Sequence, residues 1–320
     1  MTAALLLVVF AGAVSALGRR ILCRPWALRS PRVAVIGWQA LSTSVVASIL
    51  LAAVALALPF LPLRFSLAYL LGAHTLTIVE HYETPLGSWP GLVGLTLVAG
   101  LTTMLIATTV RSFARTRRIR RSQLNALQLV GRRDPGGFTV IEHEVPVAYC
   151  LPGSGSGTVV LSSAAVDLLD DHERELVLGH ERSHLRARHD LALAYSGALA
   201  RTFPWVPVFK DAHEQVAVLL EMAADDAASS PADRRTLAAA IVALGTGARP
   251  DTTLAASDTA ALVRVRRLTS PTRSPVRGLG VLAGAAVALV LALPWGLALA
   301  PAVEAATMDC CTAADLAARS

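Results

Sequence analysis

The sequence predicts an integral membrane protein with four transmembrane helices and an α+β domain between the third and fourth. Two observations predict this fold class. Hydrophobic residues make up 54% of the 320 residues, charged residues only 16%, and the mean hydropathy is +0.54, whereas soluble domains carry about 25% charged residues. In addition, four apolar runs approach the roughly 20 residues that a helix needs to cross a bilayer, and one long segment of ordinary polarity separates the last two.

The predicted spans lie at residues 2–17, 33–58, 91–110 and 278–302. The first is short, but it is read as a span and not as a signal peptide. A signal peptide has Lys or Arg before its apolar stretch, and none precedes this one. Pro59 and Pro62 close the second span, and Trp89 lies at the boundary of the third, where an amphipathic ring is favoured. Pro294 interrupts the fourth span, which a membrane helix tolerates if a neighbour satisfies the freed carbonyl group.

Arginines predict the orientation of the spans. Only Arg64 lies between the second and third spans, whereas the other connections are rich in arginine. The arginines nearest the spans are Arg19, Arg20, Arg24, Arg29, Arg32, Arg111, Arg115, Arg117, Arg118, Arg120, Arg121, Arg264, Arg266, Arg267, Arg273 and Arg277. By the positive-inside rule, the first connection and the segment 111–277 face the cytoplasm, and the amino terminus, the loop 59–90 and the tail 303–320 lie outside. The basic run 111–121 is expected to contact lipid headgroups rather than nucleic acid.

The segment 111–277 is expected to form one α+β domain that ends in a linker. Its first part is typical of strands and its second part of helices, and Asp170 or Asp171 can cap the first of these helices. The predicted strands are 138–142, 145–151 and 158–162, and the predicted helices start near His172 and cover 191–202 and 211–228. The polar, proline-containing stretch 250–275 is read as a linker back to the membrane.

The first predicted helix carries the motif His180-Glu181-Arg182-Ser183-His184. Two histidines four residues apart lie roughly 40° apart on one helix face, so both rings can reach one metal ion. Glu181 lies beside that face, where it can act as a general base on a water molecule that Zn²⁺ activates. The pattern therefore predicts a zinc hydrolase centre.

A third ligand is expected from a following helix. Glu221 fits best, and Glu214, two turns earlier, remains the alternative. Asp225, one turn after Glu221, can hydrogen-bond a ligand histidine. Arg188, Arg201 and His213 are left open as donors to the oxyanion, and His172, His189 and His213 are read as structural or solvated, with His189 nearest the cleft. The strand 145–151 can bind a peptide by strand addition.

With these residues placed, the chain resembles the BlaR/MecR-type membrane zinc metallopeptidases. The resemblance covers the order of three spans, a zinc domain and a fourth span. It is sharpest over Ala148–Asp190, and it resumes at Thr202–Phe209 and at Glu221-x-x-x-Asp225. It implies a gluzincin-like zinc endopeptidase in a bacterial cell membrane, with His180, His184 and Glu221 as ligands and Glu181 as base. Its implied substrate is a cytoplasmic BlaI/MecI-like transcriptional repressor, and its implied setting is antibiotic-resistance signalling.

One departure from that family is the short tail after the last span. The sensors of the family carry a penicillin-binding domain there, and 303–320 is too short for one. The peptidase is then expected to be activated by another protein, or by a signal that the spans and the loop 59–90 detect. The polar residues of that loop are read as ordinary, and they are His74, Glu80, His81 and Glu83.

Two other functions compete with this one. An HtpX-like quality-control protease is disfavoured because such enzymes usually place two spans before the zinc helix and two after it. A non-catalytic signal transducer is disfavoured by the intact Glu181. The expected partners are a protein substrate and the lipid bilayer, without direct nucleic-acid binding, and a homodimer is allowed. Cys310 and Cys311 are read as free thiols.

Overall fold

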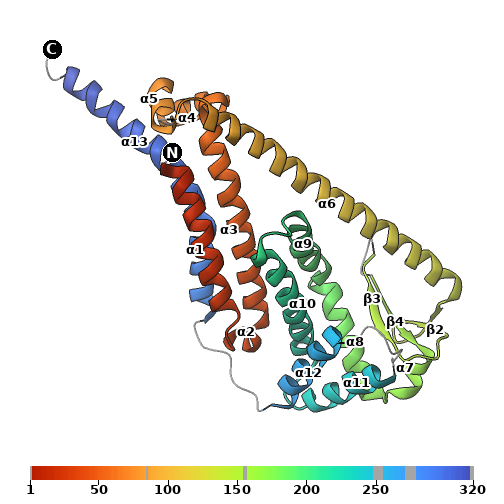
Figure 1. Cartoon of the computed structure of the whole chain (residues 1–320). Helices are drawn as coiled ribbons and strands as arrows, with labels where there is room; N and C mark the ends of the chain where they lie inside the picture. Colours follow the sequence, from red (N-terminus) through yellow and green to blue (C-terminus); the bar gives the residue numbers. More distant parts are fainter. Residues whose placement is uncertain (1, 84–85, 154–156, 248–254, 271–278, 318–320) are drawn as a thin grey trace. The chain divides into compact units, whose positions relative to one another are not determined.

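The computed structural model describes residues 2–83, 86–153, 157–247, 255–270 and 279–317 (Figure 1). The described part of the chain is mostly helical, with one small sheet. The elements are, in order, α1 (Thr2–Leu22), α2 (Trp26–Arg29), α3 (Pro31–Ala57), η1 (Leu58–Phe60), α4 (Leu63–Leu71), α5 (Thr75–Tyr82), α6 (Trp89–Val130), β1 (Arg132–Arg133), β2 (Thr139–Ile141), β3 (Ala148–Leu151), β4 (Thr158–Ser162), α7 (Ser163–Leu168), α8 (Asp171–Arg186), α9 (His189–Thr202), α10 (Pro207–Ala228), α11 (Arg234–Gly247), α12 (Ala255–Thr269) and α13 (Leu279–Ala317).

The chain divides into two compact units, which are described separately. The membrane unit comprises residues 1–24, 36–108 and 278–320, and the α+β unit comprises 25–35 and 109–277. The short connection between α1 and α3 thus groups with the α+β unit rather than with the helices that it joins.

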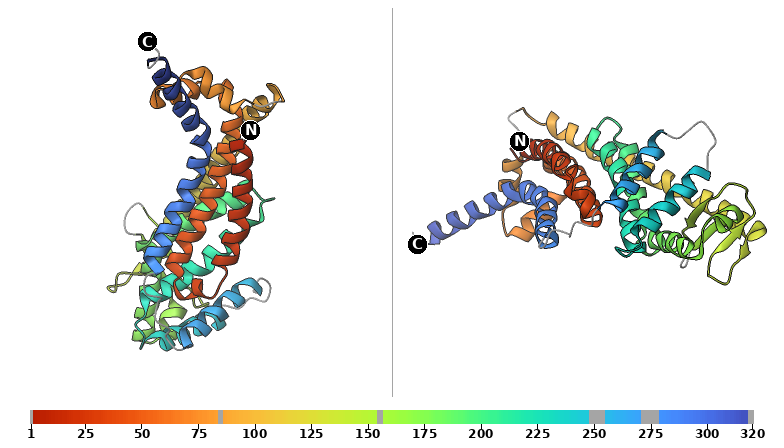
Figure 2. Two further views of the ribbon diagram at one scale, coloured as in Figure 1. Left: turned by 90° about the vertical axis from the view of Figure 1, so that its left-hand side faces the viewer. Right: turned by 90° about the horizontal axis from the view of Figure 1, so that it is seen from below.

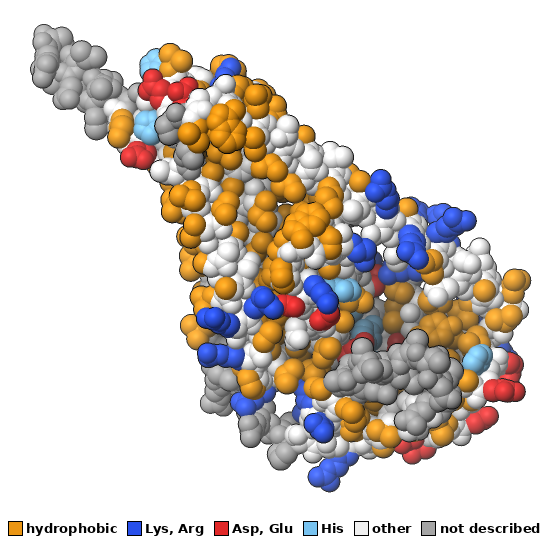
Figure 3. All heavy atoms as spheres, in the orientation of Figure 1, with side chains coloured by type: hydrophobic (Ala, Val, Ile, Leu, Met, Phe, Trp, Pro, Cys, Tyr) orange, Lys and Arg blue, Asp and Glu red, His pale blue; other side chains and the backbone are white. Residues whose placement is uncertain are grey.

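Four helices are long and apolar enough to cross a membrane. They cover Thr2–Leu22, Pro31–Phe60, Trp89–Val130 and Gly280–Met308. Hydrophobic side chains cover much of the surface of the long helices in Figure 3. Such a surface is stable in lipid and costly in water, so these helices indicate a membrane protein.

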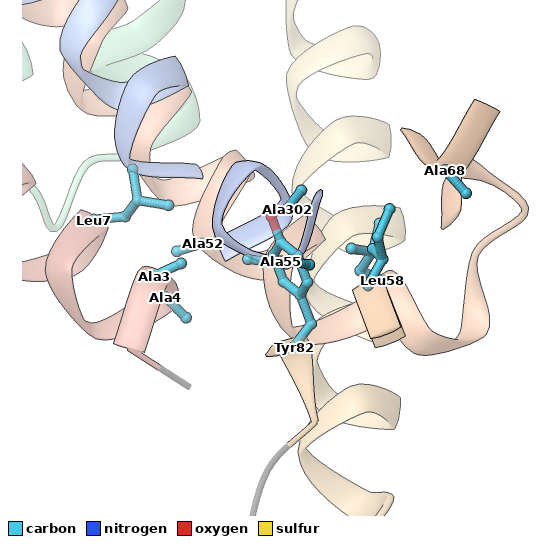
Figure 4. Close-up of a cluster of buried hydrophobic side chains, with 11 residues drawn as sticks. Ala3, Ala4, Leu7, Ala52, Ala55, Leu58, Ala68, Tyr82 and Ala302 are labelled. Carbon is cyan, nitrogen blue, oxygen red and sulfur yellow. The ribbon is translucent and has the colours of Figure 1, made fainter. Parts of the chain in front are cut away.

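Alanine is frequent in one buried cluster of the membrane unit. Figure 4 shows alanines of α1, α3 and α13 in the same buried cluster as Leu7, Leu58 and Tyr82. Small side chains let helix backbones approach closely, which is how helices pack where lipid removes the hydrophobic driving force. The hydroxyl of Tyr82 donates to the carbonyl oxygen of Ala298 at 2.7 Å and fastens α5 to α13.

Pro294 lies inside α13, and α3 compensates for it. Proline has no N–H, so the carbonyl group of Val290, four residues earlier, loses its helical donor. The hydroxyl of Ser44 donates to that oxygen at 2.8 Å. Figures 1 and 2 show α1, α3 and α13 lying side by side.

Several helices extend beyond the predicted spans or lie between them. The loop 59–90 contains two short helices, α4 and α5, and Gly72 closes α4 in the left-handed conformation (φ 66°). Helix α6 continues past the predicted span 91–110 as far as Val130, and no glycine or proline occurs between Gly100 and Gly131 to end it earlier. The tail after residue 302 continues α13 as far as Ala317, and the side chains of Cys310 and Cys311 lie outside the described residues.

The α+β unit contains a four-stranded sheet of order β1-β2-β4-β3. The β2–β4 pair is parallel and the other two pairs are antiparallel. The three predicted strands match β2, β3 and β4 to within a few residues. The order leaves β3 at an edge, where its outer backbone groups have no strand partner among the described residues.

Helix α8 lies at the centre of this unit. Its Leu178 packs on sheet residues including Val159 and Leu161, while its Leu176 packs on Leu237 of α11. At its start, Asp170 and Glu173 form a capping box, with the Glu173 N–H donating to Oδ1 of Asp170 at 2.7 Å. Burial on two sides fixes the rotation of α8 about its axis, and therefore fixes where its polar motif points.

The predicted linker 250–275 is wrong where the structure describes it. Residues Ala255–Thr269 form α12, which packs against α11 and buries Leu268. Residues 250–254 and 271–275 lie outside the described residues.

Candidate metal centre

Three predicted ligands meet between α8 and α10. The Nε2 atoms of His180 and His184 are 3.1 Å apart. The carboxylate of Glu221 reaches both, with Oε2 3.4 Å from Nε2 of His180 and Oε1 3.5 Å from Nε2 of His184. In the described part of the chain, this is the one group of three His, Cys, Asp or Glu side chains whose ligand atoms fall within 4.8 Å of one another.

These separations fit a zinc ion. Zn–N and Zn–O bonds of 2.0–2.2 Å in a tetrahedral site place neighbouring ligand atoms about 3.4 Å apart. When the rings of His180 and His184 are neutral, their Nε2 atoms and the carboxylate of Glu221 offer three lone pairs to one cation. Three protein ligands leave a fourth position for water or substrate, as in catalytic zinc sites.

Asp225 lies behind His180. Its side chain is fully buried, and Oδ1 lies 3.0 Å from Nδ1 of His180, on the ring edge opposite the metal position. A carboxylate placed there orients a ligand ring and raises its basicity. The predicted pair Glu221 and Asp225 thus occupies one face of α10, one turn apart.

Arg264 of α12 completes the cluster, although its place in the sequence predicted only a position beside the fourth span. Its guanidinium donates to both oxygens of Asp225, from Nε at 2.9 Å and from Nη2 at 2.7 Å. Its Nη1 lies 3.0 Å from Oε2 of Glu221. One largely buried arginine thus holds the third ligand and the carboxylate behind the first ligand.

The pKa values follow from these contacts. Burial lowers the pKa of His180, but Asp225 and Glu221 outweigh it and raise that pKa to about 9. Burial raises the pKa of Glu221 and of Asp225, but His180 and Arg264 outweigh it and lower both to about 2. Burial also lowers the pKa of His184 to about 4. The carboxylates are therefore charged at neutral pH and favour a bound cation.

Glu181 lies beside the cluster, against Cys150 of β3. Burial raises the pKa of its carboxyl group, opposed by the charge of His180 and by a hydrogen bond from the Cys150 thiol. The same burial, together with the charge of Glu181, raises the pKa of Cys150 to about 12, so this cysteine is a thiol at neutral pH. A carboxylate with a raised pKa next to a metal position suits proton transfer.

A cleft of about 610 Å³ opens onto the cluster. Helix α6 lines one side through Thr116, Ile119, Arg120 and Gln123, and β3 contributes Tyr149, Cys150 and Leu151. His184, His189 and Glu221 lie in its wall. The stretch of α6 beyond residue 110, which was expected only to contact lipid, therefore also lines this cleft.

The other predicted residues lie apart from the cluster. Glu214 is exposed and lies 3.9 Å from Lys210, so the structure brings Glu221, and not Glu214, to the histidines. His172 pairs with Asp233. Nδ1 of His213 is 3.1 Å from the hydroxyl of Ser196, and Arg201 donates to Ser112. Arg188 lies 3.8 Å from Asp190 at the cleft edge.

Residues 114–245 match Peptidase family M48. The matched segment contains the His180–His184 motif, Glu221 and Asp225, and it ends before α12. No curated protein and no solved structure matches the chain. The chain therefore carries a metallopeptidase domain, and the match identifies neither a BlaR/MecR-type subgroup nor a substrate.

Proposed function

We propose that this chain is a membrane-bound zinc endopeptidase of regulated proteolysis that cleaves a cytoplasmic transcriptional repressor. The observation that carries the peptidase part is the cluster of His180, His184 and Glu221 with Glu181 beside it. The M48 match over the same residues supports it independently. The repressor part rests on the resemblance to BlaR/MecR-type proteins.

The residues divide the work of peptide hydrolysis. His180, His184 and Glu221 would hold the ion, which when bound acts as a Lewis acid and lowers the pKa of water to near 7. Glu181 takes a proton from the attacking water as the oxygen of that water bonds to the scissile carbonyl carbon. Glu181 then returns that proton to the amide nitrogen as the C–N bond breaks. Asp225 and Arg264 keep the ligand side chains in place.

The cleft suits an extended peptide. β3 is an edge strand, and Tyr149, Cys150 and Leu151 line the cleft. A substrate strand can pair with the free edge of β3 through backbone hydrogen bonds, which read main chain and tolerate varied side chains. We expect cleavage at an extended segment of the substrate rather than within a helix.

The orientation supports a cytoplasmic substrate. The arginines of the α1–α3 connection, of α6 beyond residue 110 and of α12 all precede or follow candidate spans on the same predicted side. The positive-inside rule then places the metal centre in the cytoplasm of a bacterial cell, where repressors are found, and both termini outside.

The test uses intact protein in membranes with a candidate repressor from the same cell, with and without a cell-wall antibiotic. Wild type, Glu181→Gln and the matched control Glu214→Gln are compared, because Glu214 is an exposed carboxylate of α10 outside the cluster. Mass spectrometry of the repressor should show defined fragments with wild type and E214Q and none with E181Q.

The other outcomes choose between functions. If no repressor is cut but misfolded membrane proteins accumulate with E181Q, the protein is a quality-control protease. If neither changes while zinc remains bound, the metal domain is a non-catalytic scaffold and the peptidase proposal is wrong.

A further inference from the structure

His184 lacks the carboxylate partner that His180 has. Asp225 lies at Nδ1 of His180. At the corresponding atom of His184, among the described residues, lies a ring nitrogen instead: Nδ1 of His189 is 3.0 Å from Nδ1 of His184. The two rings meet edge to face, with centroids 4.8 Å apart and planes at 90°. His189 is buried, with 8% of its surface exposed.

The chain takes a strained turn to bring His189 there. α8 ends at Arg186, and Arg188 adopts the left-handed conformation at φ 52° and ψ 43°. It is the one non-glycine residue with positive φ in the described part of the chain. This conformation costs about 1–2 kcal/mol for a residue with a Cβ atom, and such strain gathers at functional sites. The turn makes His189 the first residue of α9 and directs it back to α8.

The next residue anchors the turn. Asp190 lies 3.0 Å from Nη2 of Arg120 on α6, and its side chain is only 13% exposed. Its other oxygen lies 3.8 Å from Nε of Arg188. The first turn of α9 is therefore held from two sides, so His189 is fixed rather than free to swing into the cleft.

The hydrogen-bond partners of His184 and His189 determine which tautomer each ring adopts. A neutral imidazole carries one N–H, and a metal ligand must keep the lone pair on its bound nitrogen. Nε2 of His184 faces His180 and Glu221, so the proton of His184 belongs on Nδ1. That N–H donates to Nδ1 of His189, which accepts and carries its own proton on Nε2.

We propose that His189 is a positioning residue that accepts the Nδ1–H of His184 and so fixes the ring and tautomer that present Nε2 to the metal. The proposal rests on the metal centre of the proposed function. Partners of ligand histidines are typically worth 10–100-fold in metal affinity. His189 acts only through His184 and need not touch the substrate.

The test is the zinc dissociation constant of intact protein in lipid nanodiscs, measured by competition with a chromophoric chelator. Asparagine places an amide oxygen where Nδ1 stood, glutamine places one farther out, and leucine places none. We expect H189L and H189Q to weaken zinc binding about 10–100-fold and H189N to stay within a few-fold of wild type. The matched control is H213L, because His213 pairs with Ser196 away from the cluster. The absorption spectrum of the Co²⁺-loaded protein should change with H189L and H189Q only.

Two results would overturn the proposal: zinc affinity unchanged in H189L, or equal losses in H189N and H189Q. Should H189L fail to fold, the comparison of H189N with H189Q carries the same test. If the wild type itself binds no zinc, both the proposed metal function and the role of His189 are wrong. If all variants bind zinc equally well, only the role of His189 is wrong.

Discussion

The two units of the molecule bury polar groups in opposite ways. In the α+β unit, charged side chains are buried together: Asp225 is fully buried and is held by Arg264 and His180. In the membrane unit, the buried contacts are single hydroxyl groups on backbone carbonyls, such as Ser44 on Val290 and Tyr82 on Ala298. The first arrangement places charged groups at the candidate metal centre, whereas in the second Ser44 replaces a donor that Pro294 removes and Tyr82 joins α5 to α13.

This difference implies different costs of disruption. Removing one member of a buried ion pair leaves an uncompensated charge in a medium of low dielectric. Removing a hydroxyl from a membrane helix leaves one carbonyl group without a partner, and its net cost is small because the unfolded helices also find partners in the membrane. Variants of buried polar groups and of close helix contacts in the two units test that contrast.

Asp225→Ala should destabilise the α+β unit by about 3–5 kcal/mol, because Arg264 is left buried without its bidentate partner. Thermal unfolding of the protein in chelator separates this effect from metal binding. The matched control is Asp226→Ala, whose carboxylate pairs with Arg267 but remains 32% exposed. The double variant D225A/R264L should lose less than the sum of the single losses, and additive losses would mean that the pair is not coupled.

Arg264→Gln should weaken zinc binding about 10–100-fold, because Glu221 and Asp225 lose the cation that holds both carboxylates. Isothermal titration of the metal-free protein measures the change. Arg266→Gln, two residues away on the same helix, serves as the control. An R264Q protein that binds zinc like the wild type would show that α12 is a structural cover and not part of the metal centre.

Gly94→Leu should lower the stability of the membrane unit by about 1–3 kcal/mol, the usual cost of overpacking. A Cβ atom at Gly94 would lie 2.7 Å from the carbonyl oxygen of Ala53 and 2.8 Å from the amide nitrogen of Ala57, both in α3. Thermal unfolding in nanodiscs reports the change. Gly100→Leu is the control on the same helix, because nothing lies within 4 Å of its added Cβ. Equal stability of the two variants would contradict close packing of α6 on α3.

Ser44→Ala should cost the least, about 0.6 kcal/mol. The carbonyl oxygen of Val290 then loses the donor that replaces the missing N–H of Pro294. Restoring that N–H with the double variant S44A/P294A should recover the loss, which a stability measurement in nanodiscs can detect. A Ser44→Ala loss as large as that of Asp225→Ala would remove the contrast between the two units.

The sequence predicted the part of the site that local spacing encodes. His180 and His184, and likewise Glu221 and Asp225, are four residues apart on one helix, so each pair shares a face in any helical fold. A catalytic zinc site has three protein ligands, and this requirement alone predicted that the helix with Glu221 lies against the helix with His180 and His184. The strands were also predicted, because short runs with β-branched residues are separated by turn residues over 138–162.

The missing parts depend on contacts far apart in the chain. Arg264 reaches Asp225 across 39 residues, and the composition of 250–275 hid its helix. The spacing of Ala261, Val265 and Leu268 was the available signal, since it marks one apolar helix face. The contact of His189 with His184 depends on the left-handed turn at Arg188, which no residue preference of arginine predicts.

The most direct test of the account is the metal content of the intact protein. Wild type purified from membranes without chelator should contain one zinc ion per chain by elemental mass spectrometry, and His180→Ala should contain none above background. Wild type without stoichiometric metal, or H180A with undiminished zinc, would contradict a metal centre at His180, His184 and Glu221.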